Sequence, residues 1–219
     1  MSRAGEELRR TDAIRGTHLP PMSAPSPTGR DARVAGLWYL LLAIAGIFSL
    51  QYVPTLIVQG NAAATAANFL SREEVVRVGI VGELIEAVLS IFLVRALYRL
   101  LAGVDRKRAS LMVTLVLVAV PIAFVVVLSE IAALFLFNGA GLMPAFSTPQ
   151  LDALGMMFLN LHGQGLYVVS VFWGLWLFPF GLLVYRSGFL PRLLGVLLVV
   201  NGFAYLGISV ASLLFPAYS

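Results

Sequence analysis

The chain contains no cysteine, and this absence removes three kinds of chemistry at once. It cannot form a disulfide, bind a metal ion through a thiolate or attack a substrate with a thiol. Charged residues are scarce too: they make up 12% of the 219 residues, whereas a soluble domain carries about a quarter. Because so few polar side chains cannot cover a water-facing surface, the composition excludes an ordinary soluble protein.

Motifs for nucleotides, nucleic acids and serine hydrolysis are also missing. The sequence has no Walker-type loop, no G-x-G-x-x-G turn and no G-x-S-x-G elbow. The net charge of +4 favours contact with nucleic acid, but the basic residues flank apolar runs and are not grouped with exposed aromatic residues. We therefore expect no nucleic-acid partner.

What the chain has in abundance is hydrophobic residues, at 59% of the sequence. They form long runs, each at or beyond the roughly 20 residues that a spanning helix needs. The third run contains Pro121 but no polar turn, so we keep it as one span. Residues 34–219 are predicted to form an all-α, polytopic transmembrane bundle of five spans: Gly36–Val58, Val75–Ala102, Ser110–Phe137, Gly155–Tyr185 and Leu193–Phe215.

Basic residues fix the predicted orientation. Residues 1–33 are rich in Arg, Pro and Ser and are expected to be a disordered cytoplasmic tail. Of the 15 Lys and Arg residues, only Arg72 and Arg77 fall on the side of the membrane opposite to this tail. Because loops rich in Lys and Arg stay in the cytoplasm, we predict a cytoplasmic N-terminus and an outside C-terminus.

Polar residues inside the predicted spans share one depth in the outer leaflet, counted at about 1.5 Å per residue. A charged side chain facing hydrocarbon costs several kcal/mol, so these residues are expected to turn into the bundle and meet. The predicted polar cluster, a candidate binding site, consists of Gln51, Glu83, Glu86, Glu130, Asn160, His162 and Gln164. Trp38, Trp173 and Trp176 are instead expected to anchor the membrane interface.

Several chemistries fit a cluster of this composition. Imidazole and carboxylate groups both bind divalent ions, which makes His162, Glu83 and Glu130 candidate metal ligands. There is no H-E-x-x-H motif, so no cofactor is predicted outright, and a divalent metal stays an alternative to a metal-free site. A structural hydrogen-bond network is the remaining interpretation.

The leading hypothesis for function is an integral membrane protein that handles a small molecule, lipid or ion through this Glu/His cluster. Proton or ion movement needs only titratable groups in a water-accessible crevice. A membrane-embedded, metal-dependent enzyme and a non-catalytic lipid-binding or accessory protein are the alternatives, so catalysis stays open. The expected partners are membrane lipids and a small-molecule or ion ligand.

Several stretches resemble a family of bacterial membrane proteins, domain of unknown function 4386. They are "ARVAGLWYLLLAIAG", "GNAAATAANFL", "RVGIVGELI", "HGQGLYVVSVFWGL" and "YRSGFLPRLLGVLLVVNGFAYL". The most specific pieces are the H-G-x-G step at His162–Gly165 and the R-S-G-x-L-P-R-x-L-G turn at Arg186–Gly195. The resemblance extends from about Ala32 to the C-terminus and includes the acid at Glu83. It implies a multi-pass protein of the bacterial plasma (inner) membrane, and it implies no activity.

Overall fold

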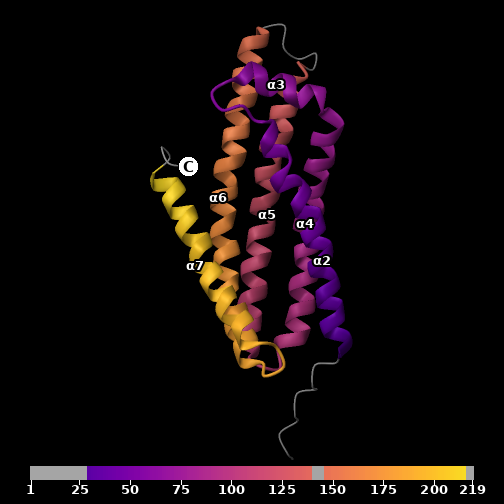
Figure 1. Cartoon of the computed structure of the whole chain (residues 1–219), viewed down its shortest axis with the longest axis vertical. Helices are drawn as coiled ribbons and strands as arrows, with labels where there is room; N and C mark the ends of the chain where they lie inside the picture. The colour runs from indigo at the N-terminus through magenta and orange to yellow at the C-terminus, as the bar shows by residue number, and fades with distance from the viewer. Residues whose placement is uncertain (1–28, 140–145, 216–219) are drawn as a thin grey trace, which may run out of the picture.

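The computed structural model describes residues 29–139 and 146–215, apart from the side chains of 47–50. Within these ranges the chain is all-helical and contains no strand, which confirms the predicted class. The long helices run side by side in an elongated bundle (Figure 1). The helices are α2 (Gly29–Gln51), α3 (Ala62–Ser71), α4 (Glu73–Leu101), α5 (Arg106–Phe137), α6 (Thr148–Arg186) and α7 (Arg192–Leu214), with a 3₁₀ turn η1 (Val53–Leu56).

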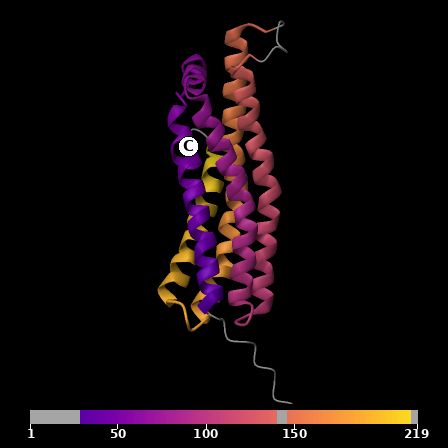
Figure 2. The same ribbon diagram turned by 90° about the vertical axis from the view of Figure 1, so that its right-hand side faces the viewer.

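Three of the described helices, α5, α6 and α7, are long and apolar enough to cross a membrane. Helices α2 and α4 run alongside them in both views (Figure 2). Helix α5 is continuous through Pro121, as expected, and α6 is continuous through Pro179. The 39 residues of α6 span about 58 Å at 1.5 Å per residue, so this helix exceeds the roughly 30 Å hydrocarbon layer.

The observed helix bounds differ from the expected spans mainly at both ends of α2 and at the start of α6, which begins at Thr148 rather than Gly155. Helix α2 begins at Gly29, which makes residues 29–33 helical, whereas the rest of the expected tail lies outside the described residues. The same helix ends at Gln51 rather than Val58 because Pro54 lacks the N–H that an α-helix needs, and the chain continues into η1.

Helix α3 is a finding that the sequence analysis missed. The side chain of Asn61 caps it by accepting a hydrogen bond of 2.9 Å from the N–H of Ala64. Asn68 ties it to η1 by donating to the carbonyl of Leu56 at 3.0 Å. The helix lies across one end of the bundle (Figure 1) and packs mainly against α6. It therefore lies beside the upper part of α6, which extends beyond it (Figures 1 and 2).

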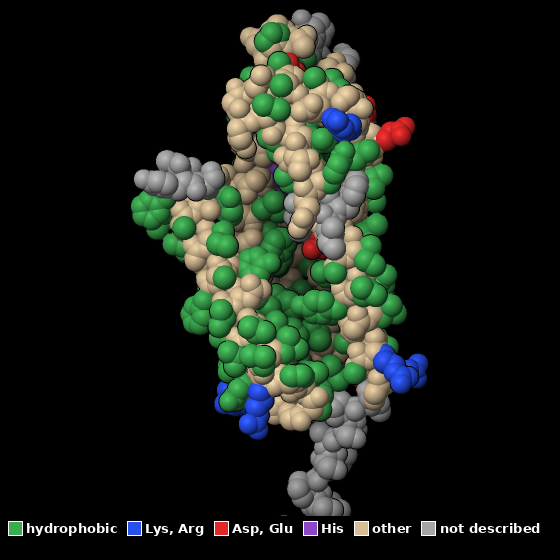
Figure 3. Space-filling model, viewed as in Figure 1, with side chains coloured by type: hydrophobic (Ala, Val, Ile, Leu, Met, Phe, Trp, Pro, Cys, Tyr) green, Lys and Arg blue, Asp and Glu red, His purple; other side chains and the backbone are tan. Residues whose placement is uncertain are grey.

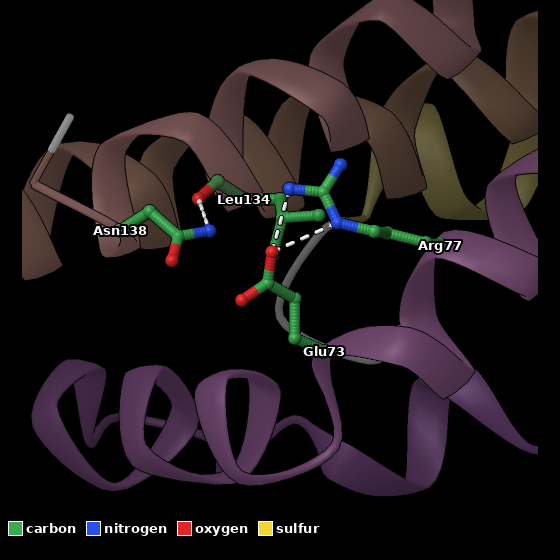
Figure 4. A network of polar contacts seen from close by, with 4 residues as sticks. All are labelled: Glu73, Arg77, Leu134 and Asn138. Atoms are coloured by element: carbon green, nitrogen blue, oxygen red, sulfur yellow. Dashed lines mark hydrogen bonds and ion pairs between the residues drawn. The ribbon is translucent and has the colours of Figure 1, made fainter.

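Polar contacts at the helix ends are local to each helix (Figure 4). Arg77 donates to Glu73 one turn earlier at 2.8 and 2.5 Å, and Asn138 donates to the carbonyl of Leu134 at 3.2 Å. The opposite end of the molecule carries most of the Lys and Arg side chains visible in Figure 3. The two ends of the bundle therefore differ in charge.

Helices that follow one another in the sequence also pack against one another. The order of packing is α2, α4, α5, α6 and α7, with α2 and α7 at the ends of the row. Glycines allow α6 and α7 to approach closely: a Cβ at Gly181 would lie 2.7 Å from the carbonyl oxygen of Gly195, and one at Gly174 would lie 2.9 Å from that of Gly202. The α6–α7 contact therefore depends on the absence of side chains at these points.

Two apolar cores divide the bundle along its length. The upper core surrounds Phe69 and Val76, below the α3 end, and the lower core surrounds Leu101, Met112 and Leu183, toward the basic end. All five of these side chains are fully buried. On α4, Glu83 and Glu86 lie between residues of the two cores, and on α5 Glu130 lies within the upper core, between Val127 and Ala133.

Candidate functional site

Three titratable side chains from three helices meet inside the bundle. Nε2 of His162 in α6 lies 3.2 Å from Oε2 of Glu83 in α4, which is hydrogen-bond distance. The same nitrogen lies 4.0 Å from Oε2 of Glu130 in α5. One ligand atom from each residue lies within 4.8 Å of the other two. We call these three residues the Glu–Glu–His cluster.

Glu130 is the most unusual member of the cluster. It is 1% exposed, and neither of its carboxyl oxygens has a hydrogen-bond partner among the described residues. A buried polar group without a partner costs roughly 1–3 kcal/mol, and a charged group costs more. The carboxyl group of Glu130 therefore lowers the stability of the fold unless it is protonated or gains a partner beyond the distant imidazole of His162.

Helix geometry explains why His162 reaches the cluster when the nearby amides do not. Residues two apart on an α-helix are rotated by about 200°, so Asn160 and Gln164 lie on the other side of α6 from His162. Both amides are exposed, and Gln51 at the end of α2 is exposed as well. These three side chains therefore do not join Glu83, Glu130 and His162 in the Glu–Glu–His cluster.

Glu86 takes an intermediate position. It is partly buried one turn along α4 from Glu83, but it does not belong to the group within 4.8 Å. Its carboxyl group faces α2, where a Cβ at Gly46 would lie 3.1 Å from it. A glycine in α2 therefore gives this carboxyl room, and both Glu83 and Glu86 line an adjoining cavity.

The cavity has a volume of about 240 Å³ and lies on the side of the cluster toward the lower core. Its lining comes from all five long helices and is mostly apolar. Sequence reasoning missed its aromatic and polar wall, which includes Tyr39, Ser90, Trp173, Trp176, Asn201 and Tyr205. The two tryptophans were expected at the membrane interface. The sequence spacing could have indicated that Trp173 lies on the same side of α6 as the cluster, because Trp173 follows His162 by about three helical turns.

The donor set of the cluster suits a divalent transition metal. Zn²⁺ binds imidazole nitrogen and carboxylate oxygen at about 2.0–2.2 Å, so tetrahedral ligand atoms lie about 3.3 Å apart. The separation of 3.2 Å between His162 and Glu83 is close to this value, and all three ligand atoms lie within 4.8 Å of one another. Two carboxylates also balance a 2+ charge. The residues present therefore fit a metal ion.

Fold and cluster together define a class: an all-helical protein with helices apolar enough to cross a membrane and a buried Glu–Glu–His cluster between them. The family model described as Domain of unknown function (DUF4386) matches residues 34–219, and the chain belongs to this family. The resemblance noted in the sequence is thereby confirmed. No curated protein and no solved structure matches the chain.

Proposed function

We propose that this chain is an integral protein of the bacterial inner membrane that binds a divalent transition-metal ion at Glu83, Glu130 and His162. In this proposal five helices, α2 and α4 to α7, span the bilayer. The basic end and the N-terminus face the cytoplasm, and the C-terminus lies outside. Membrane lipids surround the bundle, and the metal is the ion that the cluster handles.

The observation that supports the metal is the unpartnered carboxylate of Glu130. A purely structural network would satisfy both oxygens, because an incomplete buried network is less stable than an apolar core. Here the imidazole of His162 is used by Glu83, and Glu130 is left beside it. A metal ion would bond to the Glu130 carboxylate and to both neighbours at once.

The number of ligands bears on what the metal does. Three protein ligands leave a fourth position of a tetrahedral ion for water or a substrate, as in catalytic zinc sites, whereas structural sites use four protein ligands. The cluster also adjoins a cavity through Glu83. The proposed site is therefore one whose metal ion exchanges or reacts, rather than a structural metal site.

The test is metal binding by the purified full-length protein in detergent. The protein is stripped with a chelator, incubated with Zn²⁺, Mn²⁺ or Ni²⁺, freed of excess ion and analysed by inductively coupled plasma mass spectrometry. We expect close to one ion per chain for the wild type and for Glu74→Gln, a matched variant of an exposed glutamate on α4.

Glu130→Gln and His162→Ala should each lower metal retention at least tenfold, because each removes one of three ligands. Both variants are first checked for a monodisperse elution profile. Stoichiometric metal in Glu130→Gln, or no metal of any kind in the wild type, would contradict the proposal.

A further inference from the structure

The cavity beside the cluster carries a second inference, independent of any metal. We propose that it binds a hydrophobic amine, with the cationic head at Glu86 and the apolar body among the residues of α5 and α6. The ligand class follows from the charge, the shape and the access of the cavity. Each of these properties is read from residues outside the Glu–Glu–His cluster, except for the shared Glu83.

The charge of the residues that line the cavity indicates that its ligand is a cation. The residues lining the cavity include the acids Glu83 and Glu86 and no Lys, Arg or His. A fatty acid or a phosphate would place an anion beside these carboxylates without a counter-charge in a low-dielectric environment. A protonated amine pairs with a carboxylate in a charge-assisted hydrogen bond. Because Glu83 already contacts His162, Glu86 is the acid assigned to the amine.

The wall opposite the acids fits an apolar body. Ala119, Val120, Ala123 and Val126 of α5 line one side, and Val169 and Trp173 of α6 line another. Trp173 and Tyr205 form an edge-to-face pair with ring centroids 6.4 Å apart, which fixes part of the wall. Aromatic rings also attract cations through their faces. An ammonium ion with a short alkyl chain meets favourable contacts at both ends.

The volume limits the size of the ligand. At about 240 Å³ the cavity lies just below the roughly 300–1,000 Å³ of ordinary ligand pockets. It therefore has room for a small amphiphile rather than a two-chain lipid.

Access to the cavity is lateral. The upper and lower cores close the bundle above and below it. The face between α7 and α2 is hollowed in Figure 3, and an acidic side chain is visible in the hollow. These two helices stand at the ends of the packing row, so the hollow between them faces the surrounding apolar phase. A hydrophobic amine partitions into that phase and can enter from it.

The experiment uses 8-bromooctylamine as the probe and quenching of tryptophan fluorescence as the readout. Bromine quenches at short range, and Trp173 and Trp176 line the cavity. The background Trp38→Phe removes the third tryptophan. We expect saturable quenching by the amine at concentrations at least tenfold lower than those needed for 8-bromooctanoate or 8-bromooctanol, which have the same chain without the cation.

Two variants locate the site. Glu86→Gln should weaken amine binding at least tenfold, and Ala123→Phe should abolish saturation by filling the cavity, whereas the exposed Glu74→Gln should change nothing. Equal binding of the octanoate, or unchanged quenching in both cavity variants, would overturn the proposal. Glu130→Gln separates the two sites, because it should lose metal and keep the amine. Loss of the amine in Glu130→Gln would move the ligand to the cluster and refute the cavity site.

Discussion

Replacing Glu130 by Met should make the metal-free protein more stable. Met has a similar length and volume but no polar atom, so it fills the same space between α4 and α6 without a carboxylate. In the structure the two Glu130 oxygens are buried and lack hydrogen-bond partners among the described residues. Their removal therefore relieves a penalty of roughly 1–3 kcal/mol. A stability shift of 1 kcal/mol moves the melting temperature of a chain this long by about 2–4 °C, so we expect an increase of about 2–12 °C.

Added metal should stabilise the wild type and leave the stability of Glu130→Met unchanged. At a free Zn²⁺ concentration of a hundred times the dissociation constant, binding to the folded state stabilises the wild type by about 2.7 kcal/mol. The variant lacks one of three ligands and gains nothing at that concentration. The difference in stability measured in chelator should therefore shrink to nearly zero or reverse.

The assay is thermal unfolding in detergent, followed by intrinsic fluorescence, with chelator and with Zn²⁺ for both proteins. A matched change, Val127→Met, alters a buried apolar residue on the same helix and controls for the insertion of Met. The reasoning is refuted if Glu130→Met lowers the melting temperature in chelator by more than Val127→Met does. Such a result would mean that the carboxylate stabilises the apo fold.

Three further predictions test other parts of the structure. Gly181→Leu should destabilise the protein by about 1–3 kcal/mol or more, because a Cβ at this position would lie 2.7 Å from the carbonyl oxygen of Gly195. Gly207→Leu should be tolerated, because a Cβ there would have nothing within 4 Å, and thermal unfolding compares the two variants. The backbone N–H of Arg108 donates to the Asp105 carboxylate at 3.0 Å and holds the pKa of Asp105 below its usual value. The stability that the ionised Asp105 contributes is therefore fully present above its unfolded pKa of about 3.9 and is lost as the pH falls through its pKa in the folded protein. Asp105→Asn should remove this part of the acid sensitivity while retaining the helix cap, as melting curves between pH 7 and pH 3 will show. Because the chain has no natural cysteine, Lys107→Cys and Gln59→Cys give a clean topology test: an impermeant maleimide should label Gln59→Cys in intact cells and Lys107→Cys only after permeabilisation.

The sequence predicted well the depth of each polar side chain along the bundle, and poorly the direction in which each side chain points around its helix. Depth follows from helix rise and from the antiparallel course of the chain, so Glu83, Glu130 and His162 could be assigned to one level before any packing was known. Rotation about each helix axis depends on side-chain packing between helices. Asn160 and Gln164 share the depth of His162, but they lie on another face of α6 and are exposed.

Local capping signals explain where the helix bounds differ from the expected spans. The fourth span was expected to begin at Gly155, but α6 begins at Thr148, directly after Ser147, which forms a capping box with Gln150. Helix α3 escaped prediction because an Ala-rich segment between two apolar spans is too short to cross a bilayer, and its cap at Asn61 was not given weight. Its stability comes from tertiary contacts with η1 and α6, which no local pattern reports.

Apolar residues above and below the cluster bear on whether the proposed site binds an ion or conducts it. A conducting path needs polar groups at successive depths toward both ends of the bundle. Among the described residues, the segment above the cluster is closed by the fully buried Phe69 and Val76, and the segment below the cavity is closed by Leu101, Met112 and Leu183. An ion at the cluster would therefore meet apolar side chains in both axial directions. This arrangement favours the proposed binding site over a pore along the axis of the bundle.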